Sequence, residues 1–208
     1  MAGQQWVSLI NGASARATGP GTTLATSAST ATISPCQGGA LTADVATVNP
    51  DGQPLGWYAG MLIRVTARGF LNSAGTTSNL SWALAANKGN SSGWYGTNLA
   101  ATTTLALGTG SITGIQWELS AFIRCIAISQ TAGTIATQGS VIFPNAVPGA
   151  PLALTTANAM IMPMPNISGE TSYASVDTTQ ITGIGLRATL SAAFGTVACT
   201  QWVVETLD

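Results

Sequence analysis

The stretch from residue 114 to residue 130 reads G-I-Q-W-E-L-S-A-F-I-R-C-I-A-I-S-Q and alternates between two sets of side chains. A period of two over this length is typical of a long β-strand with one face in the core. At about 3.4 Å per residue this stretch would span more than about 50 Å, so a bend or bulge is expected. The core-facing set is predicted to be Ile115, Trp117, Leu119, Ala121, Ile123, Cys125 and Ala127.

Both faces of this strand become apolar after Phe122, and we expect the bend there. A segment that is apolar on both faces is predicted to be covered on both sides. Three covers are possible: the irregular residues 144–176, the N-terminal residues, or another subunit.

The rest of the chain also reads as strands, and no capped 3.6-residue periodicity indicates a helix. Residues 60–71 and 79–86 suggest a hairpin, as do 178–190 and 196–206, and a tight turn joins 114–130 to 134–143. By parity Trp82 and Trp117 are core residues. The prediction is an all-β protein, an antiparallel β-sandwich of eight or more strands that is jelly-roll-like and carries an extended N-terminal arm. In a jelly roll, one sheet would hold residues 60–71, 101–107, 114–130 and 178–190.

Residues 1–56 differ in composition from the remainder. Ala, Thr, Ser and Gly dominate them, which favours an extended, low-complexity arm with short strands at 30–34 and 41–48. Pro50, Asp51 and Gly52 form a turn signal near the predicted boundary with a β-sandwich core domain at 57–208. Trp6 is the aromatic residue with which such an arm could contact a partner.

Charge is scarce, with six basic and seven acidic residues among 208, no histidine and a net charge of −1. This composition argues against nucleic-acid binding, and no apolar run is long enough to predict a membrane span or a secretion signal. Without histidine or paired carboxylates we expect no enzyme, no metal and no cofactor. The three cysteines, Cys36, Cys125 and Cys199, cannot all pair, which favours buried thiols in a reducing cytoplasm.

Three groups of residues are candidates for interaction. Trp94 and Tyr95, in the loop K-G-N-S-S-G-W-Y, could stack on a sugar, contact a neighbouring chain or fold back over a sheet edge. A methionine patch could be an adaptable contact surface or could seal one end of the fold. Charged residues on the non-core parity of their strands could form a ladder at a subunit interface. The methionines are Met160, Met162 and Met164, and the charged residues are Arg64, Arg68, Glu118, Arg124 and Arg187.

Several segments resemble structural proteins of tailed bacteriophages, in particular head decoration (cement) proteins. They are A-G-M-L-I-R-V-T-A-R-G-F-L-N-S, T-S-N-L-S-W-A-L-A, G-I-Q-W-E-L-S-A-F-I-R-C-I-A, A-T-Q-G-S-V-I-F and Q-W-V-V-E-T-L-D, all within residues 57–208. The resemblance implies a jelly-roll-like sandwich, trimers on a capsid lattice and no enzymatic activity. It supplies no site residues.

The leading hypothesis is therefore a virion protein, made in the host cytoplasm, that binds the major capsid protein on the capsid surface as a homo-oligomer. A trimer is expected, with no nucleic-acid or membrane partner. The alternative is a receptor- or carbohydrate-binding module of a tail fibre or adhesin, and a tail-tube or neck subunit is a third possibility.

Overall fold

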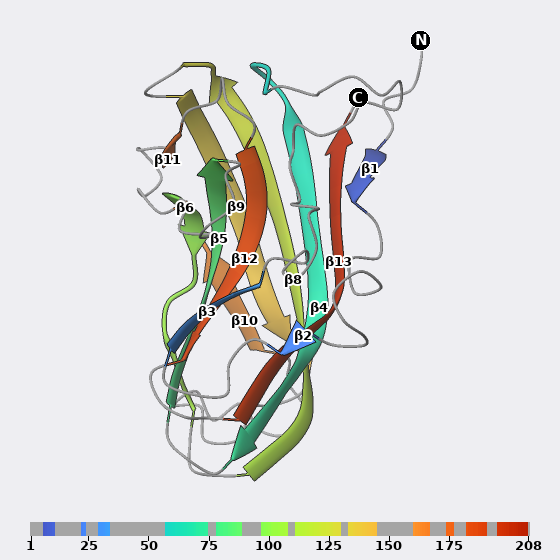
Figure 1. The fold of residues 1–208 in the computed structure, drawn as a ribbon, viewed down its shortest axis with the longest axis vertical. Coiled ribbons are helices and arrows are strands. Elements are labelled where there is room, and N and C mark those ends of the chain that lie inside the picture. The colour runs from blue at the N-terminus through green and yellow to red at the C-terminus, as the bar shows by residue number, and fades with distance from the viewer. Residues whose placement is uncertain are drawn as a thin grey trace.

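The computed structural model describes residues 6–10, 22–23, 29–33, 57–74, 78–88, 97–107, 111–129, 133–144, 160–166, 174–176, 182–190 and 195–207. Every regular element among them is a strand, and the strands pair antiparallel. They form two sheets that face each other (Figure 1), so the predicted all-β antiparallel sandwich is confirmed. These residues include no helix long and apolar enough to span a membrane.

Within the described residues, the larger sheet has eight strands. Its order is β1 (Trp6–Ile10), β13 (Gly195–Leu207), β4 (Leu62–Ala74), β8 (Ser111–Ala127), β9 (Gly133–Phe143) and β10 (Met160–Met164), with β11 (Ala174–Val176) paired to β9 and β2 (Thr22–Thr23) paired to β13.

The smaller sheet has five strands in the part of the chain that the structure describes. Its order is β3 (Ser29–Ile33), β12 (Thr182–Leu190), β5 (Ser78–Lys88) and β6 (Thr97–Ala101), with β7 (Leu105–Leu107) paired to β5.

The long alternating stretch is β8, which pairs with β4 on one side and β9 on the other. The predicted parity is confirmed from Trp117 to Cys125, whose odd-numbered side chains are buried. Pairing with β4 is regular from Arg124 back to Ile115, so no register break occurs at Phe122. The irregularities lie at the two ends of the strand, and past the one at Cys125 the side chain of Ala127 is exposed instead of buried.

The strand grouping expected for a jelly roll is wrong. Strands β7 and β12 lie in the smaller sheet, whereas β4 and β8 lie side by side in the larger one. The two expected hairpins, β4 with β5 and β12 with β13, are also wrong, because in each case the chain crosses from one sheet to the other. Apolar alternation identifies a strand and its buried face, but it carries no information about the neighbouring strand.

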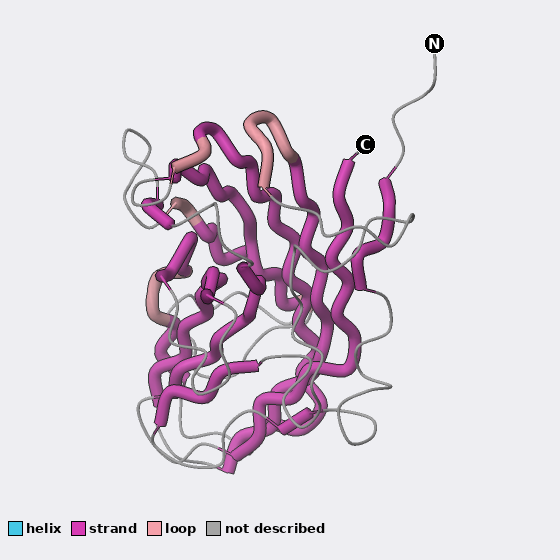
Figure 2. The backbone as a smooth tube through the Cα atoms, turned by 45° about the horizontal axis from the view of Figure 1, so that its top comes forward, coloured by secondary structure: helices cyan, strands magenta, loops and turns pink. Residues whose placement is uncertain are grey.

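Three described segments of the N-terminal residues belong to these sheets. Strand β1 pairs with β13 at one edge of the larger sheet (Figure 2), and β3, the strand predicted at 30–34, pairs with β12. The strand predicted at 41–48 lies outside the described residues. These pieces of the predicted arm therefore extend the sheets of their own chain, and the domain boundary at residue 56 remains a prediction.

The two sheets meet at a pair of tryptophans. Trp82 of β5 and Trp117 of β8 are both buried, with ring centroids 4.5 Å apart and planes inclined by 43°. Neither indole N–H has a hydrogen-bond partner among the described residues, so packing holds the rings there. Gly69 of β4 makes room for this contact, because a Cβ there would lie 2.6 Å from the Trp117 ring and 1.8 Å from the Ala198 carbonyl oxygen.

We expect Gly69→Ala to lower the free energy of unfolding by about 3 kcal/mol, since neither the buried ring nor the strand backbone can move away cheaply. Chemical denaturation followed by tryptophan fluorescence measures the change. Thr66→Ala, on the opposite face of the same strand, is the control and should change the free energy of unfolding by less than about 0.5 kcal/mol. Equal stability of the two variants would contradict the proposed close packing.

Candidate functional site

The outer face of the larger sheet, which points away from the smaller sheet, carries most of the described charges. The strand register places Arg64 opposite Glu205 and Arg68 opposite Glu118. The Arg64 Nε donates to Glu205 Oε2 at 2.7 Å, and Arg68 Nη2 lies 3.1 Å from Glu118 Oε1. The prediction that Arg64, Arg68, Glu118 and Arg124 share one outer face is confirmed by the burial of the residues that alternate with them.

Two parts of the charge prediction need correction. Arg187 lies in β12 of the smaller sheet, so it does not belong to this face. Glu205, which the predicted set of charged residues did not include, is the partner of Arg64 and lies in strand β13. The stretch W-V-V-E-T-L carries no signal that identifies it, because apolar residues occur at both parities of this strand.

The two ion pairs differ in their exposure. The side chains of Arg64 and Glu205 are 33% and 19% exposed, while those of Arg68 and Glu118 are 59% and 45% exposed. Water screens the second pair more strongly, so its contribution to stability is smaller.

Double-mutant cycles with Arg64→Ala and Glu205→Ala should give a coupling energy of about 1 kcal/mol, because this pair is half-buried and makes two contacts. The matched cycle with Arg68→Ala and Glu118→Ala should give less than about 0.5 kcal/mol, and about 1 M salt should remove it. Urea denaturation of the variants measures both. A larger coupling for the Arg68 pair would contradict the ranking.

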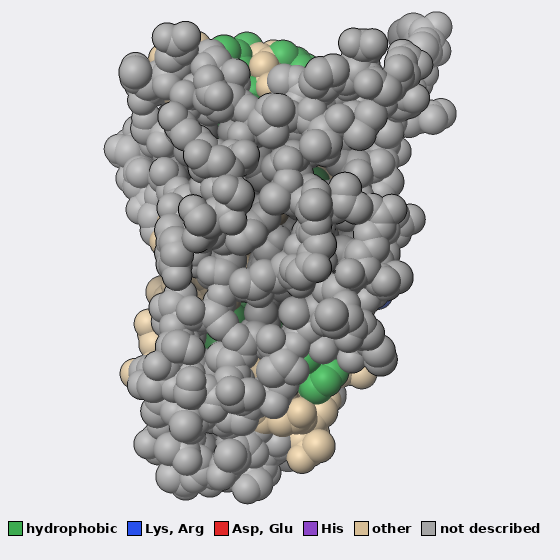
Figure 3. All heavy atoms as spheres, viewed as in Figure 1, with side chains coloured by type: hydrophobic (Ala, Val, Ile, Leu, Met, Phe, Trp, Pro, Cys, Tyr) green, Lys and Arg blue, Asp and Glu red, His purple; other side chains and the backbone are tan. Residues whose placement is uncertain are grey.

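A second feature is the apolar end of β8, which we define as Phe122 and Ile126 of the strand together with Ile128 just after it. Their exposed fractions are 45%, 40% and 41%. Tyr58, 43% exposed, lies in a turn held beside this end of β8, because the Gly60 N–H donates to the Cys125 carbonyl at 2.8 Å. Figure 3 shows hydrophobic side chains at the upper end of the molecule, the end at which β8 terminates in Figure 1. The expected cover on this end is therefore incomplete within the chain.

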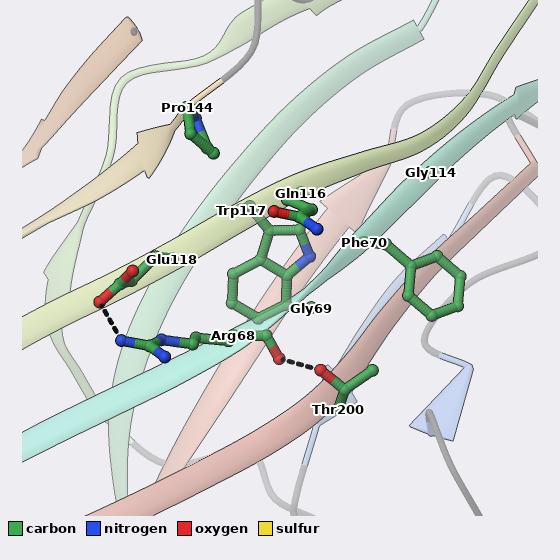
Figure 4. Close-up of a pocket in the computed structure, with 9 residues that line it drawn as sticks. All are labelled: Arg68, Gly69, Phe70, Gly114, Gln116, Trp117, Glu118, Pro144 and Thr200. Atoms are coloured by element: carbon green, nitrogen blue, oxygen red, sulfur yellow. Dashed lines mark hydrogen bonds and ion pairs between the residues drawn. The ribbon is translucent and has the colours of Figure 1, made fainter.

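A third feature is an open groove of about 650 Å³ at the other end of the same sheet (Figure 4). It runs over β13, β4 and β8 and reaches the end of β9. The described residues that line it are Arg68, Gly69, Phe70, Gly114, Gln116, Trp117, Glu118, Pro144 and Thr200.

The other predicted interaction residues are dispersed. Trp6 lies in β1 opposite Leu207, and Trp94 and Tyr95 lie outside the described residues. Arg124 is exposed, opposite Leu62 and Ala136.

The prediction for the methionine patch needs a correction. Met160, Met162 and Met164 form strand β10 instead of an irregular segment, and their side chains are 4%, 5% and 0% exposed. They complete the core beside β9 and cannot present a contact surface in this fold.

The cysteines at positions 125 and 199 are buried, free thiols, whereas Cys36 lies outside the described residues. Burial raises the pKa of both thiols, that of Cys199 from 9.0 to about 12. Both are therefore protonated and unreactive near neutral pH. Over the part of the chain that the structure covers, no group of three or more Cys, Asp or Glu side chains could hold a metal ion.

The raised pKa of Cys199 predicts a pH dependence of stability. Between about pH 9 and pH 12 the unfolded chain loses the thiol proton while the folded chain keeps it, so the free energy of unfolding falls by up to roughly 1.4 kcal/mol per pH unit. Cys199→Ala removes this titration and should flatten the curve. Denaturation at several pH values measures it, and parallel curves for the two proteins would contradict the prediction.

Comparisons with known proteins add little to this geometry. No protein-family model matches the chain, and no curated protein matches it. Among solved structures, the chain is similar to the CBM2 module of the evolved Dit of Lactobacillus casei BL23 phage J-1. The match covers 86% of this chain and 68% of that chain, with 10% sequence identity and a TM-score of 0.27. At that TM-score the likeness carries no weight for fold or function.

Proposed function

We propose that this chain is a structural protein of a tailed-bacteriophage virion, and specifically a decoration protein that binds the outside of the assembled head and stabilises it. The observation that supports this most is the apolar end of β8, where Phe122, Ile126 and Ile128 are each at least 40% exposed at the end of a central strand. Large apolar side chains exposed on a rigid sheet favour docking against another protein.

The mechanism is mechanical. Each Å² of apolar surface that docking removes from water contributes about 25 cal/mol, before the cost of association is subtracted. A protein that binds only the assembled shell stabilises that shell by mass action. The partner in this proposal is the major capsid protein, the chain acts as a homotrimer on the capsid surface without catalysis, and neither nucleic acid nor membrane takes part.

The sequence resemblance supports the same class. Two of the segments that carry it, residues 117–125 and 202–207, lie in β8 and β13, the two strands that flank β4. The resemblance therefore covers the centre of the larger sheet, which also carries the apolar end of β8.

A second candidate is an adhesion module of a tail fibre, and the groove at Arg68 and Glu118 favours it. The two functions differ in how many copies each particle needs. A decoration protein occupies a repeated lattice and is present in hundreds of copies, while a fibre tip is present in few.

Quantitative gel analysis of particles of the phage that encodes this chain should find hundreds of copies per head, because the lattice repeats the binding site. Removing the tails by fractionation should leave the chain with the heads. A few copies that follow the tails would overturn the decoration role and favour the adhesion module.

Ile126→Asp should weaken binding to heads that lack the protein by at least tenfold, because docking would bury an unpaired carboxylate. Co-sedimentation of purified protein with such heads measures the affinity. Thr104→Asp adds the same charge at an exposed position outside β8 and should bind like the original chain. If both variants bind equally well, the apolar end of β8 is not the docking surface.

A further inference from the structure

The groove on the outer face of the larger sheet is formed where the strands on both sides of β4 depart from regular pairing. In β13 the register with β4 shifts between Cys199 and Gln201, and Thr200 is the extra residue. In β8 the register shifts beyond Ile115, and Gly114 adopts a positive φ of 69°. Both Thr200 and Gly114 line the groove. Bulges of this kind redirect side chains and are frequent beside functional sites.

Hydrogen bonds hold both irregular segments in place. The Thr200 hydroxyl donates to the Arg68 carbonyl at 3.2 Å, and the Gly114 N–H donates to Asn72 Oδ1 at 2.7 Å. The walls of the groove are therefore preformed, which reduces the entropy that a ligand would lose on binding.

The polar groups of the groove select the chemistry of a ligand. Arg68 offers only donors, Glu118 only acceptors, and Gln116 offers both. The Arg68 and Glu118 charges compensate each other at 3.1 Å, so the lining described in the structure has no unpaired cation to attract a phosphate or carboxylate. A ligand that satisfies these groups together is uncharged and carries donors and acceptors side by side.

An apolar surface accompanies these polar groups. Phe70 is half-buried at one side of the groove, with the Arg68–Glu118 pair at the other, and Pro144 is exposed at the end of β9 (Figure 4). An aromatic face packs against the axial C–H groups on the face of a saturated ring, while the equatorial hydroxyls at the rim of that ring reach the polar side chains. The volume of about 650 Å³ is within the range of small-ligand sites.

We propose that this groove is a binding site for a neutral saccharide, whose hydroxyls bridge Arg68, Glu118 and Gln116 while its ring packs on Phe70. The proposal does not depend on head binding, because the groove and the apolar end of β8 lie at opposite ends of that strand. A protein that binds heads and has no saccharide affinity would overturn only this proposal.

The test uses the full-length chain on a printed array of neutral and acidic oligosaccharides, followed by isothermal titration with the best neutral glycan. We expect binding to neutral glycans and at least a tenfold loss of affinity in Gln116→Ala and in Phe70→Ala. The matched control is Gln138→Ala, an exposed glutamine on the same sheet outside the groove, which should bind normally. Binding limited to acidic glycans, no binding at all, or equal losses in Gln138→Ala would overturn the proposal.

A measurement on the unmodified chain keeps the proposal testable if a variant fails to fold. Titration with the neutral glycan should shift the amide resonances of Gly69 and Gly114 in the groove. Those of Ile126 and Ile128, at the other end of the face, should stay in place. The reverse pattern would place the saccharide elsewhere and overturn the assignment.

Discussion

The contact between Trp82 and Trp117 is the constraint on which the rest of the sandwich depends. Among the residues whose side chains the structure describes, these are the largest that are fully buried, one from each sheet, and their centroids are 4.5 Å apart. Trp117 can lie there only because Gly69 on the adjacent strand has no side chain. One packing arrangement thus links three features: the spacing of the sheets, the regular pairing of β4 with β8, and the absence of a side chain at position 69.

This packing also organises the outer face. Side chains alternate across a strand, and the odd-numbered residues of β8 pack against the smaller sheet. The even-numbered residues Gln116, Glu118 and Phe122 must therefore point outward. The register with β4 then brings Arg68 opposite Glu118, and the register of β4 with β13 brings Arg64 opposite Glu205. In a chain with so few charges, two cross-strand ion pairs on one face neutralise most of the charge there. The face is left with a polar groove at one end and the apolar end of β8 at the other.

These two ends suit different partners. The apolar end of β8 exposes three large apolar side chains to water, so it favours a protein surface. The groove combines compensated charges, an amide and an aromatic ring, so it favours a small uncharged polar ligand. A virion protein that binds a head through one and a saccharide through the other would need no overlap between the two contacts.

The amino-acid sequence by itself determined that the chain is all-β, which residues of β8 face the core from Trp117 to Cys125, and that Arg64, Arg68, Glu118 and Arg124 face outward. Each of these follows from alternation within one strand, and alternation is a local property.

The tertiary structure alone decided which strands are neighbours, and hence the placement of β12 in the smaller sheet. It also decided the pairing of Arg64 with Glu205 and the burial of Met160, Met162 and Met164, because each joins residues far apart in the chain. The groove belongs to the same group: it arises from two bulges on different strands, and only the registers of both with β4 bring Thr200 and Gly114 to one place.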